Sequence, residues 1–212
     1  FLIKNAKINQ TTKILDIGCG RGKILGHLSN RLKLKNKPLG IDLENHKDRN
    51  KSFNFKKIDA LTYFKKNKKT FDLILIKQTI HLFKITKIKK LLKLCKSKLN
   101  QNGKIIIITL DPYYNEIPTF PLMARQLKIS LERDKKIIKL ISRLYSTRTM
   151  KKFSFNVIVS KKKYLEMIKS RYISILLRFS SKEILEGISE LNFKFKKVIK
   201  FKDKLRCIVI KK

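Results

Sequence analysis

The 212-residue chain has few acidic residues. Its 15 Asp and Glu face 53 Lys and Arg, which leaves a formal net charge of +38 at pH 7. A chain of this charge associates with polyanions at low salt, so RNA is a partner class to weigh. Phosphate and base recognition more often use Arg, but here Lys far outnumbers Arg and is scattered along the chain. Drift in composition therefore explains the charge better than selection for RNA binding.

Cysteine is scarce as well, and long apolar runs are missing. The three cysteines, Cys19, Cys95 and Cys207, are odd in number and lack metal-ligand spacing, which predicts reduced thiols, no metal site and a cytoplasmic location. No segment approaches the roughly 18 apolar residues of a membrane span, and the first residues do not form a signal peptide. The chain does not begin with Met, which suggests truncation at its N-terminus. No repeat or Gly/Ser/Pro-rich linker divides it, so we expect one domain over 1–212 and a monomer.

Short apolar segments alternate with lysine-rich amphipathic ones over the first 110 residues, which predicts strands alternating with helices. Strands are expected at 12–18, 37–42, 53–60, 71–77 and 104–110, with helices at about 22–32 and 84–99. A turn over residues 100–103 is expected to separate the second helix from the last of these strands. This order is typical of a doubly wound, mostly parallel α/β sheet with helices on both faces. Its ligand should bind at the carboxyl ends of the strands, so 1–110 is the predicted ligand-binding half.

The pattern changes after residue 110. Residues 111–123 contain three of the four prolines and are predicted to form a loop, which a long helix follows. We expect the segment 111–160 to cover the ligand edge of the sheet. Residues 161–212 are expected to add helices and a last strand, with a hairpin turn over Asp203 and Lys204.

The first strand runs into a glycine-rich loop with the sequence KILDIGCGRGK. A dinucleotide-binding turn has the spacing G-x-G-x-x-G, but here Gly18, Gly20 and Gly22 give G-x-G-x-G and Lys23 takes the place of the third glycine. A phosphate-binding P-loop requires a hydroxyl residue after its Lys, where this chain has Ile24. Neither a dinucleotide nor a triphosphate loop fits this spacing.

An acidic residue, Asp16, precedes the glycines and suits an ammonium group better than a pyrophosphate. The resulting pattern h-h-D-h-G-x-G-x-G resembles motif I of the class I S-adenosylmethionine-dependent methyltransferases. The resemblance continues in order over residues 12–110: Asp42 ends the second strand in GIDLEN and Asp59 ends the third in KIDAL. FDLILIKQTIHLF and LNQNGKIIIITL resemble the fourth-strand and fifth-strand motifs.

The resemblance implies a Rossmann-like seven-stranded sheet with an antiparallel last strand, and S-adenosylmethionine as cofactor. Gly18 and Gly20 would let the backbone approach the methionine part, and Asp16 would hold its amino group. Asp42 would accept hydrogen bonds from the ribose hydroxyls, and Asp59 from the adenine amino group. The full set of implied cofactor-binding residues is Asp16, Gly18, Cys19, Gly20, Asp42, Leu43, Asp59, Ala60, Lys77 and Gln78.

His81 lies shortly after the fourth strand, where the resembled family lines its catalytic face. It is the candidate general base, and the alternative is a histidine that only packs or faces solvent. The sequence DPYY supplies two candidate substrate contacts, Tyr113 and Tyr114. The last quarter of the chain loosely resembles the tail of type-11 small-molecule methyltransferases, which include trans-aconitate methyltransferase-like enzymes. This resemblance implies substrate contacts from Arg171 and Tyr172.

These patterns favour a methyltransferase that acts on a small molecule. The small molecule would carry a carboxylate or another anionic group, which the many cations of the chain would bind. Two alternatives remain at this point: a methyltransferase with RNA as its acceptor, and a partner protein that binds S-adenosylmethionine without catalysis.

Overall fold

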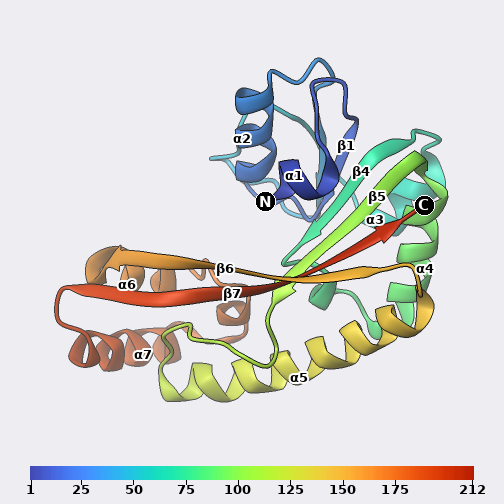
Figure 1. Cartoon of the computed structure of the whole chain (residues 1–212). Coiled ribbons are helices and arrows are strands. Elements are labelled where there is room, and N and C mark those ends of the chain that lie inside the picture. Colours follow the sequence, from blue (N-terminus) through green and yellow to red (C-terminus); the bar gives the residue numbers. More distant parts are fainter. The chain divides into compact units, whose positions relative to one another are not determined.

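A computed structural model describes residues 1–212 and contains one seven-stranded sheet with the strand order β3-β2-β1-β4-β5-β7-β6 (Figure 1). The strands are β1 (Ile14–Ile17), β2 (Leu39–Asp42), β3 (Asn54–Lys57), β4 (Phe71–Lys77), β5 (Leu99–Leu110), β6 (Thr149–Ser160) and β7 (Val198–Lys211). The pairs β3-β2, β2-β1, β1-β4 and β4-β5 are parallel, and the last strand, β7, is antiparallel. The predicted doubly wound sheet with an antiparallel last strand is confirmed.

The helices alternate with the strands, as the sequence predicts. They are α1 (Leu2–Ala6), α2 (Lys23–Leu32), α3 (Ala60–Lys66), the short 3₁₀ helix η1 (Ile80–Leu82), α4 (Ile85–Ser97), α5 (Pro121–Leu144), α6 (Lys161–Lys169), the 3₁₀ helix η2 (Ser174–Arg178) and α7 (Ser181–Lys194). None of them combines the length and the apolar character that a membrane span requires.

The strand order reverses beside β1. This strand pairs with β2 on one side and with β4 on the other, so that Leu15 lies opposite both Leu39 and Ile74. In a doubly wound sheet, ligands bind outside the carboxyl ends of the strands at such a switch point. The loops that follow β1, β2 and β4 therefore mark the first place to look for a site.

The chain forms two compact units. The first contains residues 1–109, 139–151 and 207–212, and the second contains residues 110–138 and 152–206. Most of β1 to β5 belongs to the first unit, whereas α5, β6 and β7 each contribute residues to both. Most of residues 111–160 and most of residues 161–212 lie in the second unit.

The core of the first unit is built from continuous apolar strands. All four residues of β1 are buried, and so are residues 73–76 of β4 and residues 105–108 of β5. Strands buried on both faces carry apolar residues without alternation, which explains the runs in the sequence. Helix α4 adds a buried stripe at helical spacing, made of Ile88, Leu91, Leu92 and Cys95.

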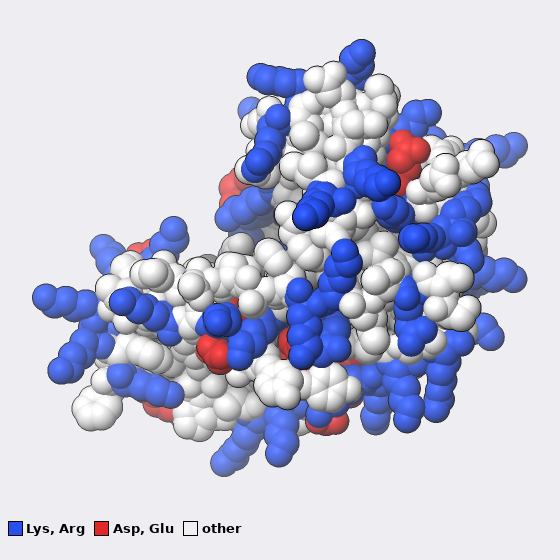
Figure 2. All heavy atoms as spheres, in the orientation of Figure 1, with Lys and Arg blue, Asp and Glu red and all other residues white.

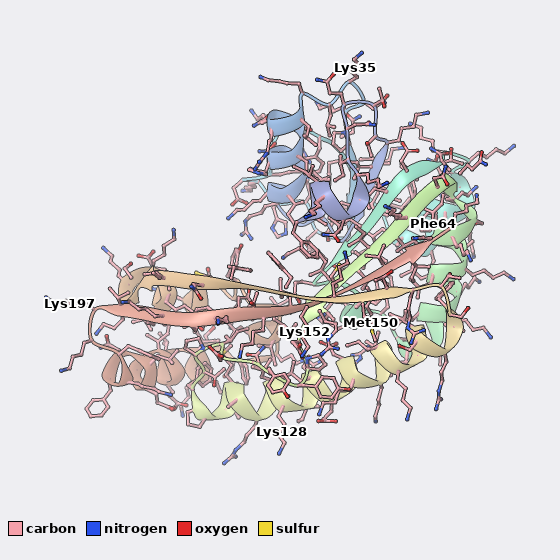
Figure 3. All side chains as sticks on the ribbon, viewed as in Figure 1. Lys35, Phe64, Lys128, Met150, Lys152 and Lys197 are labelled. Atoms are coloured by element: carbon pink, nitrogen blue, oxygen red, sulfur yellow. The ribbon has the colours of Figure 1, made fainter.

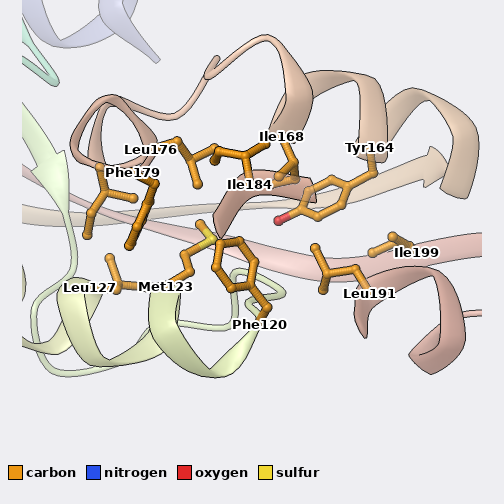
Figure 4. Packing of buried hydrophobic residues seen from close by; sticks show 11 residues of the cluster. Phe120, Met123, Leu127, Tyr164, Ile168, Leu176, Phe179, Ile184, Leu191 and Ile199 are labelled. Atoms are coloured by element: carbon orange, nitrogen blue, oxygen red, sulfur yellow. The ribbon is translucent and has the colours of Figure 1, made fainter. Parts of the chain in front are cut away.

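The second unit has a hydrophobic core of its own (Figure 4). Phe120 and Met123 pack with residues of α6, η2 and α7, among them Tyr164 and Leu191. The Tyr164 hydroxyl donates a 2.6 Å hydrogen bond to the Pro118 carbonyl, so its buried oxygen is satisfied. Helix α7 begins at a capping box in which Ser180 and Glu183 bond each other's backbone N–H groups.

Two local predictions are wrong. Residues 100–103 belong to β5 and do not form a separate turn, although the β4-β5 register shifts beside them and Asn102 adopts φ 64°. Asp203 and Lys204 lie inside the continuous strand β7, not in a hairpin turn. Neighbouring strands supply the ladder hydrogen bonds that local turn propensity cannot outweigh.

Candidate functional site

The glycine-rich loop after β1 is tied to the end of β2. The backbone N–H groups of Gly18 and Cys19 donate to the Ile41 carbonyl at 2.8 and 3.2 Å. The Gly20 N–H donates to Oδ2 of Asp42 at 2.7 Å. These bonds bring the loop and the Asp42 carboxylate to the same point at the switch in strand order.

Gly18 and Gly20 both adopt left-handed backbone conformations, with φ of 71° and 51°. A Cβ on Gly18 would lie 2.2 Å from Cγ2 of Thr79, so this glycine is required for packing. A Cβ on Gly20 would meet no atom within 4 Å. The backbone at Gly20 is therefore open to a ligand.

Thr79 is a site residue that the sequence analysis missed. It is buried, and its hydroxyl lies within hydrogen-bonding distance of the carbonyl oxygens of Gly18 (3.3 Å) and Lys77 (3.0 Å). Thr79 thereby connects the glycine loop to the end of β4. Nothing local in the sequence indicates this role, since Gly18 and Thr79 are 61 residues apart.

Asp16 is a buried acid at the end of β1. Its side chain is 4% exposed, and its Oδ1 has no hydrogen-bond partner. The pKa of this carboxyl is raised to about 8, chiefly by burial; the Lys77 ammonium opposes this rise and the Asp42 carboxylate adds to it. A buried, unmatched acceptor of this kind is suited to a cationic or hydrogen-bond-donating ligand group.

The remaining acids follow the ends of β2 and β3. Asp42 Oδ1 accepts from the Glu44 N–H at 3.1 Å, and the Asp42 carbonyl accepts from the Ile58 N–H at 2.9 Å. Asp59 caps α3 because its Oδ1 accepts from the Thr62 N–H at 3.0 Å. Its Oδ2 makes no hydrogen bond to the protein and remains free for a ligand.

Apolar and polar groups flank these acids. Leu43, directly after Asp42, is 60% exposed, whereas Ala60 is buried at the start of α3. Cys19 is a free, partly buried thiol, and burial together with the Asp16 and Asp42 carboxylates raises its pKa, so it stays protonated. The exposed Leu43 side chain offers an apolar surface beside a carboxylate.

Three further candidates lie after β4. Lys77 is its last residue, and Gln78 adopts φ 53° while its N–H donates to the Ile108 carbonyl at 2.8 Å. His81 is partly exposed in η1. All of the predicted cofactor residues, and His81, therefore lie in the first unit.

Arg21, in the middle of the glycine loop, pairs with Asp48 in the connection from β2 to β3. Its Nε donates to Oδ2 of Asp48 at 2.7 Å, and the Arg21 guanidinium lowers the pKa of that carboxyl. The arginine thus has an acidic partner within the protein.

The second unit contains Tyr113 and Tyr114. Asp111, which is 2% exposed, accepts from Arg206 Nη2 at 3.0 Å and from the Tyr113 N–H at 3.0 Å. The Arg206 guanidinium and the Lys135 ammonium lie over the Tyr113 ring, at 5.4 and 5.2 Å from its centroid.

Tyr114 borders a cavity of about 290 Å³ in the same unit. The ammonium groups of Lys152 and Lys204 lie 5.3 and 5.9 Å from the centroid of its ring. We call this cavity the cationic pocket; it is lined by Asp111, Tyr114, Lys152, Phe153, Ser154, Lys202, Lys204 and Leu205.

The other two substrate candidates are not among the residues that line this pocket. Arg171 adopts φ 51° after α6, and its Nη2 donates to the Phe179 carbonyl at 3.0 Å, which connects the end of α6 to the end of η2. Tyr172 is half exposed, and its N–H donates to the Met167 carbonyl. No group of three or more His, Cys, Asp or Glu in residues 1–212 is arranged to hold a metal ion.

Comparisons with known proteins concern the family and the fold of the chain. A family model described as a methyltransferase domain matches residues 1–160. The fold is similar to that of a SAM-dependent methyltransferase from Archaeoglobus fulgidus (22% identity, 100% of this chain and 91% of that chain, TM-score 0.55). It is also similar to a protein assigned as a methyltransferase of an antibiotic biosynthesis pathway in Anabaena variabilis (14% identity, 99% and 94%, TM-score 0.69). No curated protein matches the chain.

A third similar structure is the plantazolicin methyltransferase BpumL in complex with a pentazolic desmethylPZN analog and SAH (18% identity, 94% of this chain and 76% of that chain, TM-score 0.51). At these identities the likeness concerns the fold. The family model covers most of the chain, and the chain therefore belongs to the methyltransferase domain family. The prediction of a class I S-adenosylmethionine-dependent methyltransferase is confirmed.

Proposed function

We propose that this enzyme transfers a methyl group from S-adenosylmethionine to a small organic acceptor that carries an anionic group. The observation that carries the acceptor class is the cationic pocket, where lysine side chains surround a cavity of about 290 Å³ beside an aromatic ring. Its size is near the lower end of small-molecule sites, roughly 300 Å³.

The glycine loop and the strand-end acids fit the cofactor. The unmatched Asp16 Oδ1 would receive the amino group, and the open backbone at Gly20 would admit the methionine part. Asp42 would accept from the ribose hydroxyls, since each carboxylate oxygen can accept a second bond beside those from Gly20 and Glu44.

The adenine would be held by the residues that follow β2 and β3. The exposed Leu43 side chain would pack on the ring, Asp59 Oδ2 would accept from its amino group, and the Ala60 N–H would face a ring nitrogen. The cofactor site would be completed by the loop after β1 and by the end of β4, through Gly18, Cys19, Lys77 and Gln78.

When bound, S-adenosylmethionine would supply an electrophilic methyl group, which a lone pair of the acceptor would take from the sulfonium sulfur, leaving that sulfur as a neutral thioether. The chain's own residues then align the acceptor and exclude water. If the acceptor atom carries a proton, His81 would take it as general base, from its position in η1 after β4.

The distribution of charge favours a small acceptor over RNA. Lys and Arg are spread over the whole face shown in Figure 2, with a few Asp and Glu between them, and do not gather in one stripe. An even spread is what compositional drift produces, whereas a nucleic-acid site concentrates its cations along a track.

Incubation with S-adenosylmethionine labelled in its methyl group tests this proposal. The substrates are a protein-free small-molecule extract, separated into anionic and neutral fractions, and total RNA. We expect the label in the anionic fraction, and no label there with Asp42→Ala. Label confined to RNA or to the neutral fraction, or no label in any fraction, would overturn the proposal.

A further inference from the structure

The cationic pocket is lined by three lysines, Lys152, Lys202 and Lys204, and by one acid, Asp111. Of its three lysines, only Lys204 has an acidic partner, Glu116, with which it forms an ion pair. Lys152 and Lys202 form no ion pair in the structure, and the Lys152 ammonium rests over the Tyr114 ring. Figure 3 shows Lys152 on β6, on the side of the strand where α5 lies.

The acid that lines the pocket does not balance these lysines. Asp111 already accepts from Arg206 at 3.0 and 3.2 Å and from the Tyr113 N–H, so its charge is satisfied by the guanidinium. Lys152 and Lys202 therefore line the pocket without an ion pair of their own, although the Glu116 carboxylate interacts electrostatically with Lys202.

The other lining groups define the rest of the ligand. Tyr114 and Phe153 supply aromatic surface, and Ser154 supplies a hydroxyl group. The ligand class that matches is a small organic anion, with a carboxylate or phosphate head for the lysines and an apolar body for the rings.

We propose that Lys152 and Lys202 bind the carboxylate or phosphate group of the methyl acceptor in the cationic pocket, with Lys204 as a third cation that Glu116 restrains. The assignment to the acceptor rests on the proposed function; the anion site itself does not. Glu116 accepts from Lys204 and from the Lys202 N–H, and both hydrogen bonds lower the pKa of its carboxyl. It therefore stays charged and offsets part of the attraction for an anion.

Direct binding to the full chain without cofactor tests the site. The probes are phenyl phosphate and benzoate, with neutral benzyl alcohol as their control, at constant salt. We expect both anions to bind more tightly than benzyl alcohol. Lys152→Gln and Lys202→Gln should each weaken anion binding about tenfold, and Glu116→Gln should strengthen it severalfold because Lys204 is released. Tighter binding of phenyl phosphate would indicate a phosphate head, and tighter binding of benzoate a carboxylate head.

Lys162→Gln, at an exposed position of α6, is the matched control for lost charge and should change binding less than twofold. Equal weakening of anion binding by Lys162→Gln, or binding of benzyl alcohol as tight as that of the anions, would overturn the site. The site would also be overturned by an RNA oligonucleotide that displaces the probe equally well from every variant.

The proposed function is tested separately, in the labelling experiment. Anion binding with the expected variant effects but no methyl transfer would leave the site standing, whereas methyl transfer unchanged by Lys152→Gln and Lys202→Gln would overturn its assignment to the acceptor.

Discussion

The Gly20 N–H donates a 2.7 Å hydrogen bond to Oδ2 of Asp42, and this bond joins the loop after β1 to the end of β2. One carboxylate thus orders the glycine loop and remains available to a ligand. Its other oxygen, Oδ1, accepts from the Glu44 N–H, and each oxygen can accept a further hydrogen bond. The loop and the acid should therefore act as one unit in cofactor binding.

The first prediction concerns this pair. Asp42→Ala removes the acceptor for Gly20 and for the ribose hydroxyls, so the affinity for S-adenosylmethionine should fall about 10- to 100-fold. Isothermal titration calorimetry measures it, with Glu44→Ala as the control because Glu44 is an exposed acid two residues away. If Asp42→Ala binds S-adenosylmethionine as tightly as the wild type, Asp42 is not a cofactor-binding residue.

The second prediction follows from the burial of Asp16. Its pKa in the folded chain is about 8, raised chiefly by desolvation from an ordinary value of 3.8. The unfolded state therefore loses this proton at a lower pH than the folded state, and the stability of the folded state falls as pH rises from about 4 to about 8. Asp16→Asn lacks this proton equilibrium and should lose less stability over that range.

Urea denaturation of both proteins at pH 5 and pH 8 measures the difference. The stability of Asp16→Asn relative to the wild type should be greater at pH 8 than at pH 5. An equal pH dependence of stability in the two proteins would contradict the buried, protonated state of Asp16. If the cofactor's ammonium group pairs with this carboxylate, binding at pH 7 should also release a proton, which calorimetry in buffers of different ionisation enthalpy detects.

The third prediction separates two glycines of the same loop. Gly18→Ala would place its Cβ 2.2 Å from Thr79, so it should destabilise the fold by several kcal/mol through overpacking and left-handed backbone strain. Gly20→Ala meets no protein atom and should cost only the backbone strain, about 1–2 kcal/mol, while it weakens cofactor binding. Thermal unfolding and calorimetry on both variants test this. A larger loss of stability in Gly20→Ala than in Gly18→Ala would contradict the open space at Gly20.

How much of this site the sequence could predict depends on the separation of its parts. Asp16, Asp42 and Asp59 were predictable because each ends a strand, and parallel strands bring their carboxyl ends to one edge. Thr79 was not, because its partner Gly18 lies 61 residues away and a threonine after a strand is common. The Asp111–Arg206 pair spans 95 residues, and the cationic pocket depends on the same long-range pairing. The turn predicted at positions 100–103 from local residue types is wrong, because these residues belong to strand β5.

The fourth prediction concerns His81. As general base, this histidine would act only on the chemical step, so His81→Gln should lower kcat roughly 100-fold and leave the affinity for S-adenosylmethionine within about twofold. His27→Gln, at an exposed position of α2, is the control and should change neither value. A full rate for His81→Gln on the acceptor found by labelling would exclude the base.

The last prediction concerns the buried ion pair of the second unit. Asp111→Ala would leave the Arg206 guanidinium without its acceptor, although the side chain of Arg206 is only 14% exposed. Breaking a buried pair by removing one partner typically costs about 3–5 kcal/mol, because the other charge stays desolvated. The matched control is Glu132→Ala, which removes an exposed partner of Lys135 and should cost less than about 1 kcal/mol. Urea denaturation of both variants compares them, and Asp111→Leu with Arg206→Met should recover much of the loss, since two apolar residues leave no charge unpaired. If Asp111→Ala costs no more than Glu132→Ala, the pair does not stabilise this unit, and the Arg206 charge must be neutralised in another way.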